Sequence, residues 1–379
     1  MLDDSVQLAA VAARFVQEDV LPYLNVAGHE DQYPLELVQK LGSLGFLGMN
    51  IPPEFGGLGL DRPTMMDIDV ELGRGWLSLG ALLGSHLRAS FYFLKCGTKN
   101  QQQEYLPRLA NGELVGAHAY NEQGNRKLSR FRTTLSRQGD TYLLNGIKDW
   151  VTNAQNASFM IAIARKVLPN GNDAPVAVIV QPDRPGVHIG KDLPRPGVKG
   201  VSLCTVQFND YVVTPGDLIG GLDADIEGFI NTFKSGSSLN FSARAVGASL
   251  AVQEKCRIFL QSRDPNEGGR NAIQCRFATM ATRVQAALGL LNAAKSRSAI
   301  PAEAMAYMTK VFSTEVLQDT IRDGMMLMGG SGYASKTTSL DREYRDAASL
   351  LLIDTPNDVL VDQIGQLMLQ PTERAELPH

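Results

Sequence analysis

Cysteine and histidine are scarce in this 379-residue sequence, which contains four cysteines and five histidines. It has no Cys-x-x-Cys pair and no His-Glu-x-x-His motif, so a zinc ribbon, a disulfide scaffold and a metalloprotease are not indicated. We therefore expect no bound metal, and the cysteine usage fits a reducing, cytoplasmic location.

Long apolar runs and an excess of one charge are also lacking. No stretch approaches the ~18 apolar residues of a transmembrane helix, and the first residues are acidic, whereas a signal peptide begins with basic residues. The 36 basic and 40 acidic residues nearly balance, so the chain lacks the charge of a nucleic-acid-binding protein. We expect neither a membrane nor a nucleic acid as a partner.

Three stretches with different hydrophobic periods follow one another along the chain. Residues 1–115 show the spacing of amphipathic helices, residues 116–222 show strand signals, and residues 223–379 return to helical spacing. Since 44% of the residues are hydrophobic, a chain of this length can bury a large core. The order predicts an α+β protein with an N-terminal helical domain, a central β-domain and a C-terminal helical bundle domain.

Two local patterns allow sharper predictions. Apolar residues between Leu35 and Phe46 predict a helix that ends at Asn50, because two prolines follow. Asn145-Gly146, between the strand-like runs 141–144 and 147–151, predicts a β-hairpin with a two-residue turn. No Gly-x-Gly-x-x-Gly motif follows a strand, so a Rossmann nucleotide-binding domain is not indicated.

Five short segments, taken in order and spacing, resemble the acyl-CoA dehydrogenase family along nearly the whole chain. They are residues 51–60 (IPPEFGGLGL), residues 144–153 (LNGIKDWVTN), Arg263 with Gln274, residues 328–333 (MGGSGY) and residues 344–347 (YRDA). The resemblance implies FAD, a fold of helical, β and four-helix-bundle domains, and a homo-oligomer, either a dimer or a tetramer. It also implies an oxidoreductase that removes the α-proton of an acyl thioester while hydride leaves the β-carbon for flavin N5. An electron-transfer flavoprotein is the implied electron acceptor.

The resemblance assigns several residues to the flavin and the pyrophosphate of FAD. Trp150, Val151 and Thr152 match the segment that covers the flavin and bonds near N5. Asn121 offers an amide to the flavin pyrimidine, and Lys127 stands where the family carries a serine that bonds the pyrophosphate. A lysine can neutralise a phosphate. The alternative for Trp150 is a structural residue at a strand end, and the alternative for Lys127 is that it belongs to a loop that is merely charged.

A second group matches residues that contact the rest of FAD. Gly329 and Gly330 permit a close backbone approach to the adenosine half, and Arg263 and Gln274 resemble a pair that reaches the FAD of a neighbouring subunit. The glycines can equally end a helix, and the other two can be solvent-exposed polar residues.

The catalytic base is expected at Asp354, where most family members carry a glutamate. Aspartate is one methylene shorter, which removes roughly 1.3 Å of reach. Some family members place the glutamate on a bundle helix instead, at a position that falls near Ser237 and Ser238, so that route is absent here. The alternative is that Asp354 caps a helix, since Thr-Pro follows it and Asp358 lies in the next turn.

Four functions remain open. The first is an FAD-dependent dehydrogenase of a short acyl thioester. The acyl group is attached either to CoA or to an acyl or peptidyl carrier protein. The product would be an unusual extender unit for secondary metabolism. Arg126 and Lys127 in the altered loop favour an acidic carrier protein. The others are a flavin-dependent monooxygenase, a flavin-binding scaffold without catalysis, and a helical interaction protein without cofactor.

Overall fold

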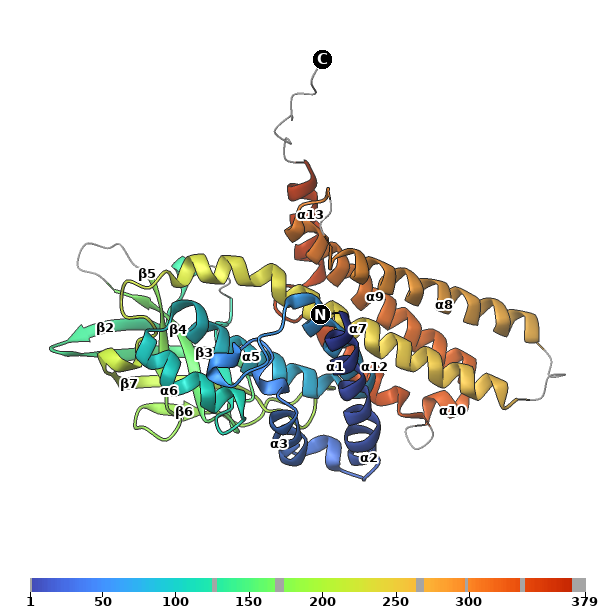
Figure 1. Ribbon diagram of the computed structural model, residues 1–379, viewed down its shortest axis with the longest axis horizontal. Helices are drawn as coiled ribbons and strands as arrows, with labels where there is room; N and C mark the ends of the chain where they lie inside the picture. The colour runs from blue at the N-terminus through green and yellow to red at the C-terminus, as the bar shows by residue number, and fades with distance from the viewer. Residues whose placement is uncertain are drawn as a thin grey trace, which may run out of the picture. The chain divides into compact units, whose positions relative to one another are not determined.

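The computed structural model describes six stretches of the chain, namely residues 2–124, 128–167, 174–263, 269–296, 299–334 and 338–369. Helices come first, strands follow, and helices return, as Figure 1 shows by colour. This order confirms the predicted α+β fold with N-terminal helices, a central β part and C-terminal helices.

The helices and strands have the following bounds. The first helices are α1 Leu2–Phe15, α2 Leu21–Leu24, α3 Leu35–Ser43, α4 Arg62–Gly75, α5 Leu77–Cys96 and α6 Lys99–Ala110. The strands are β1 Gly116–Ala119, β2 Thr134–Gln138, β3 Thr141–Thr152, β4 Phe159–Lys166, β5 Ala174–Val180, β6 Val187–Ile189 and β7 Leu203–Val213. The last helices are α7 Ile226–Gln261, α8 Arg270–Ala293, α9 Ala302–Met328, α10 Gly330–Tyr333, α12 Leu340–Leu350 and α13 Asn357–Leu369.

The chain forms two compact units, and it passes through each more than once. The helical unit comprises Met1–Val16, Arg62–Leu77 and Lys234–His379, and the sheet unit comprises Gln17–Asp61 and Ser78–Phe233. The three domain boundaries expected from hydrophobic period stay a prediction.

A seven-stranded sheet forms the centre of the sheet unit. Its strand order is β1-β4-β2-β3-β7-β6, and β5 pairs with β4. Side chains alternate between two faces of a strand, and Cys204, Val206 and Phe208 of β7, which share one face, are all buried. The longest pairing, between β3 and β7, is antiparallel.

The predicted hairpin at Asn145-Gly146 is wrong, because both residues lie inside the single strand β3. The register of β3 against β7 shifts here, which marks a bulge. The Asn145 side chain closes the bulge by exchanging hydrogen bonds with Asp210, over 2.9 and 2.8 Å. Gly146 is needed for close packing, since a Cβ there would lie 2.5 Å from Cα of Thr133. The turn between β2 and β3 lies earlier, at Gly139-Asp140.

The predicted end of the second helix is also wrong, because α3 stops at Ser43 instead of Asn50. Gly45 has φ 78°, a left-handed conformation that ends helices. A short 3-10 turn, Phe46–Gly48, follows and is buried. Gly45, two residues past the last residue of α3, therefore ends the helix before the chain reaches the prolines.

Close helix packing organises the helical unit. A Cβ on Gly247 of α7 would lie 1.9 Å from the Val70 carbonyl oxygen of α4, so the two backbones nearly touch. A buried ion pair between Arg244 and Asp69, at 2.7 Å, joins the same two helices. These contacts fix α7, whose earlier residue Ser237 belongs to the candidate site.

Candidate active site

A strand bulge exposes Trp150. The pairing of β3 with β7 shifts between Lys148 and Val151, and Trp150 between them has φ 54°. Bulges re-aim side chains, and the indole is 47% exposed while Val151 is fully buried. The strand therefore holds out a flat apolar surface of the kind that a planar ring requires.

Asn121 lies beside this bulge. Its carbonyl oxygen accepts a hydrogen bond from the N–H of Asp149 at 2.9 Å. The Asp149 carboxylate in turn accepts from the N–H of Gln123 at 2.9 Å and from the Thr205 hydroxyl at 3.2 Å. The structure thus brings exposed Asn121 together with the segment Trp150–Thr152.

A buried ion pair, which sequence reasoning missed, fixes the same loop. Lys148 Nζ donates to Glu122 Oε1 at 2.9 Å, and the two side chains are 0% and 2% exposed. The carboxylate also accepts from the N–H groups of Arg132 and Thr133, at 2.6 and 3.0 Å. Burial lowers the pKa of Lys148 to about 8 despite the attraction of Glu122. Burial opposes ionisation of Glu122, yet the Arg132 N–H and the Lys148 charge lower its pKa.

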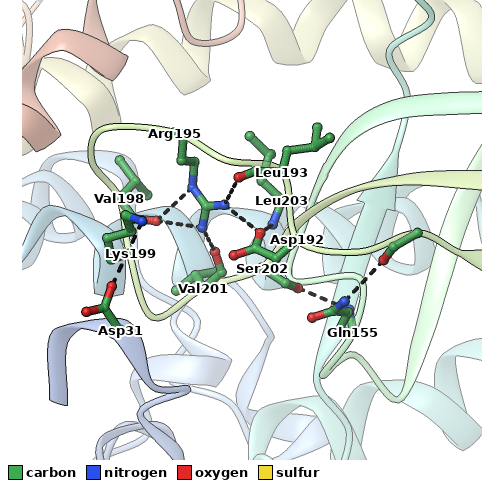
Figure 2. A network of polar contacts seen from close by, with 11 residues as sticks. Asp31, Gln155, Asp192, Leu193, Arg195, Val198, Lys199, Val201, Ser202 and Leu203 are labelled. Atoms are coloured by element: carbon green, nitrogen blue, oxygen red, sulfur yellow. Dashed lines mark hydrogen bonds and ion pairs between the residues drawn. The ribbon is translucent and has the colours of Figure 1, made fainter. Parts of the chain in front are cut away.

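A loop organised by one arginine leads to β7, beside the end of β3. The Arg195 guanidinium donates to three carbonyl oxygens of the loop, those of Leu193, Val198 and Val201, at 2.9, 3.0 and 2.5 Å (Figure 2). The Asn153 N–H donates to the Ser202 carbonyl at 2.6 Å. On the other side, the Ser85 hydroxyl of α5 donates to the Thr152 carbonyl at 3.3 Å. These contacts hold half-buried Thr152 in place. Lys127, the expected phosphate ligand, lies outside the described residues.

Four further candidates lie where the helices of the bundle begin or end, at the end of α7, near the start of α8 and at the junction of α9 with α10, elements that Figure 1 labels. They are Arg263 after α7, Gln274 on α8, Gly329 between α9 and α10, and Gly330, the first residue of α10. Arg276 of α8 pairs with Asp323 of α9 at 2.9 Å, which sets the start of α8 level with the end of α9. A Cβ on either glycine would meet no atom of the described part of the chain within 4 Å. A ligand can therefore approach the backbone there closely.

Asp354 lies in the turn between α12 and α13 with φ 63°. Its exposed carboxylate accepts a hydrogen bond from the Ser237 hydroxyl of α7. Because α13 begins at Asn357, Asp354 lies ahead of the N-cap position, and its left-handed backbone differs from the extended one typical of N-caps. Sequence reasoning located Ser237 but treated it only as the loss of a base.

Comparison with known families bears on the whole chain. Three models of acyl-CoA dehydrogenase domains match it in succession, the N-terminal domain over residues 3–113, the middle domain over 121–211 and the C-terminal domain over 236–369. The chain belongs to the acyl-CoA dehydrogenase family.

Individual members of the family cover nearly the full length of the chain. A 3-(aryl)acrylate reductase of Clostridium sporogenes is 29% identical, over 92% of this chain and 94% of its own. The short-chain specific acyl-CoA dehydrogenase of Bos taurus mitochondria is 28% identical, over 88% and 82%. Butyryl-CoA dehydrogenase from Megasphaera elsdenii has the same fold, with a TM-score of 0.88 at 23% identity over 98% and 99% of the chains.

Acyl-CoA dehydrogenases use FAD, and this chain is accordingly an FAD-dependent oxidoreductase of acyl thioesters. Its residues fit the cofactor. Trp150 exposes an indole, Asn121 exposes an amide, and Gly329 and Gly330 leave open space where side chains would stand. Bound FAD supplies an acceptor for hydride. Within the described residues, no helix is long and apolar enough to cross a membrane.

Proposed function

We propose that this enzyme oxidises a short acyl thioester and that Asp354 takes the α-proton. The observation that carries this proposal is the hydrogen bond from Ser237 to Asp354. By resemblance, family members carry the base at one or the other of these two positions. The two positions meet in this fold, and Asp354 is the carboxylate of the pair. Its exposure leaves the oxygens accessible to a substrate.

The hydroxyl of Ser237 has a specific task in this proposal. It donates to Oδ2 of the Asp354 carboxylate and so fixes the direction in which that carboxylate points. Aspartate has less reach than glutamate, and a misplacement of about 1 Å can cost on the order of 100-fold in rate. A donor that fixes the shorter side chain therefore matters more here than it does for a glutamate.

We infer that Asn121, Trp150, Val151 and Thr152 hold the flavin, and that Arg263, Gln274, Gly329 and Gly330 bind FAD of a second copy of the chain. The Asp354 turn contacts Lys310 of α9, and Gly329 ends the same helix about 19 residues later. At 1.5 Å per residue this is about 28 Å. The Asp354 turn and the glycine pair thus lie at opposite ends of α9, which favours an oligomer in which they serve the FAD of different copies.

We further propose that a carrier protein presents the acyl group. Support comes from the changed loop after Asn121, which has gained Arg126 and Lys127, and from the shorter acid at 354. AnaB, a prolyl acyl carrier protein oxidase, has the same fold, with a TM-score of 0.86, but at 23% identity it supports the fold alone. The alternative is CoA itself.

One experiment separates the two forms of the substrate. A single short acyl group, such as butyryl, is presented anaerobically on CoA and on a phosphopantetheinylated carrier protein, and flavin reduction is followed by absorbance. Faster reduction by the carrier-bound form is expected. Faster reduction by the CoA form would contradict the carrier proposal, and no reduction by either would contradict the proposed function.

A further inference from the structure

Lys310 is buried on α9 beneath the turn that carries Asp354. The residue is 1% exposed. Its ammonium donates to the Thr355 carbonyl at 3.0 Å and to the side-chain oxygen of Asn357 at 2.7 Å, with a longer contact of 3.5 Å to the Leu351 carbonyl. A buried ammonium needs such acceptors, and here all three belong to the segment around Asp354.

The three acceptors lie on both sides of Asp354. That residue has φ 63°, a backbone conformation that a non-glycine residue keeps only where its surroundings enforce it. The N–H of Asn357 closes the turn on the Leu351 carbonyl at 3.0 Å. Lys310 reaches the same two residues, so it bridges the start and the end of the turn.

We propose that Lys310 is a positioning residue for the reaction, in that its ammonium holds the turn in the shape that aims the Asp354 carboxylate at the α-proton. This inference rests on the proposed role of Asp354. Ser237 holds the carboxylate from α7, while Lys310 holds the backbone from α9. The proton step itself breaks the α-C–H bond, and the proton passes to a carboxylate oxygen of Asp354.

The protonation state of Lys310 gives the proposal a pH dependence that can be measured. Burial lowers its pKa to about 8, although the charge of Asp354 favours the ammonium. Among the described residues, the charge that acts on it is that of Asp354 on the turn, and Tyr307, three residues earlier on the same helix, has a pKa that burial raises above its ordinary value. From α13, Asn357 contributes only an amide. Above pH 8 the ammonium therefore loses its proton and a donor to the turn.

Loss of that proton does not weaken the fold. The folded pKa of about 8 lies below the ordinary 10.5, so between these values the unfolded chain binds more protons and stability rises with pH. A rate that falls above pH 8 would therefore reflect the shape of the turn and not unfolding.

The test compares Lys310→Met, Lys310→Arg and Asp354→Asn with the wild type. Two readouts are used with butyryl-CoA and with butyryl on a carrier protein: the rate of flavin reduction, and the uptake of solvent deuterium at the α-carbon, which reports proton abstraction alone. The matched control is Lys166→Met, since Lys166 also donates to a carbonyl, that of Leu222 at 3.0 Å, and both residues belong to the sheet unit.

Lys310→Met should lower both rates about 100-fold with thioester affinity and FAD content unchanged. Lys310→Arg should restore most of the rate and remove the decline above pH 8, because a guanidinium stays charged. In the Asp354→Asn background, Lys310→Met should have no further effect. The control should behave as wild type.

The outcomes separate the two proposals. If Asp354→Asn abolishes deuterium uptake but Lys310→Met does not slow it, the role of Lys310 is refuted and that of Asp354 stands. If Lys310→Met lowers the melting temperature and the FAD content as much as the rate, its role is structural and the inference is refuted. If Asp354→Asn reacts at the wild-type rate, or the wild type takes up no deuterium, the proposed function fails and this inference with it.

Discussion

The hydroxyl of Ser237 donates a hydrogen bond to the carboxylate of Asp354 across 117 positions of sequence. A hydrogen bond to a charged group contributes about 1.5–3 kcal/mol, and part of that here goes into fixing the direction of the carboxylate. The contact links the bundle helix α7 to the turn before α13, so the orientation of the Asp354 carboxylate depends on two segments that are distant in sequence.

Ser237→Ala should lower the rate of flavin reduction by a short acyl thioester about tenfold, which corresponds to ~1.4 kcal/mol. FAD content should not change, since the hydrogen bond that the variant loses is to Asp354, which is not one of the residues expected to hold FAD. Stopped-flow absorbance measures the rate. Ser43→Ala is the matched control, because Ser43 is an exposed serine whose hydroxyl bonds the Lys40 carbonyl. A wild-type rate in Ser237→Ala would show that the hydroxyl does not orient the base.

The buried pair Glu122–Lys148 should be needed for stability. Breaking a buried pair by removing one partner typically costs about 3–5 kcal/mol, so Lys148→Met should lower the free energy of unfolding by that amount. Restoring neutrality in Lys148→Met/Glu122→Gln should recover much of it. Urea denaturation measures both. Glu113→Gln is the control, since Glu113 pairs with Arg108 at the surface and such pairs contribute about 0–1 kcal/mol.

The same ion pair should make the stability of the fold depend on pH in the acidic range. The folded pKa of Glu122 is lowered below its ordinary 4.5, so its contribution is present above pH 4.5 and is lost as the pH falls through the lower, folded value. Melting temperatures measured between pH 6 and pH 3 should therefore fall more steeply for the wild type than for Glu122→Gln. Parallel curves would contradict this assignment.

Gly330→Val should weaken FAD binding about tenfold while the fold is retained. A Cβ at Gly330 would meet no atom of the described residues within 4 Å, so the fold has room for the start of a side chain there, and that side chain would occupy the region through which the adenosine half is expected to approach. The control is Gly365→Val, where the space is equally open and no FAD is expected. Titration of the apoprotein with FAD measures both affinities. Equal affinities in the two variants would place the adenosine half elsewhere.

Two inactive variants should restore each other in a mixed oligomer. If Arg263 serves the FAD of a neighbouring copy, a dimer of Asp354→Asn and Arg263→Glu chains contains one site with both changes and one with neither. Co-expressed, the two should regain part of the activity that each lacks alone. Arg257→Glu, six residues before Arg263 and exposed, should stay active by itself. Absence of complementation, or a monomer in sedimentation at micromolar concentration, would contradict the shared site.

The sequence predicts the fold well, because local period and ordered motifs carry that information, while the assignment of Trp150 to the flavin stays a prediction. The prediction from sequence fails at Asn145-Gly146, because an Asn-Gly pair can form either a tight turn or a bulge. Here the pair forms a bulge because Asn145 bonds Asp210, which lies 65 positions later in the chain. The pairing of Glu122 with Lys148 is equally invisible, because a lone carboxylate in a loop is usually solvated. Ser237 and Lys310 gain their roles only when α7 and α9 meet the Asp354 turn.

The most direct test of the central claim is anaerobic flavin reduction by a short acyl thioester in Asp354→Asn. Asparagine keeps the size and most of the polarity of aspartate but cannot accept the α-proton, so the variant should fold, retain FAD and leave the flavin oxidised. Reduction at the wild-type rate would show that the base lies elsewhere in the chain.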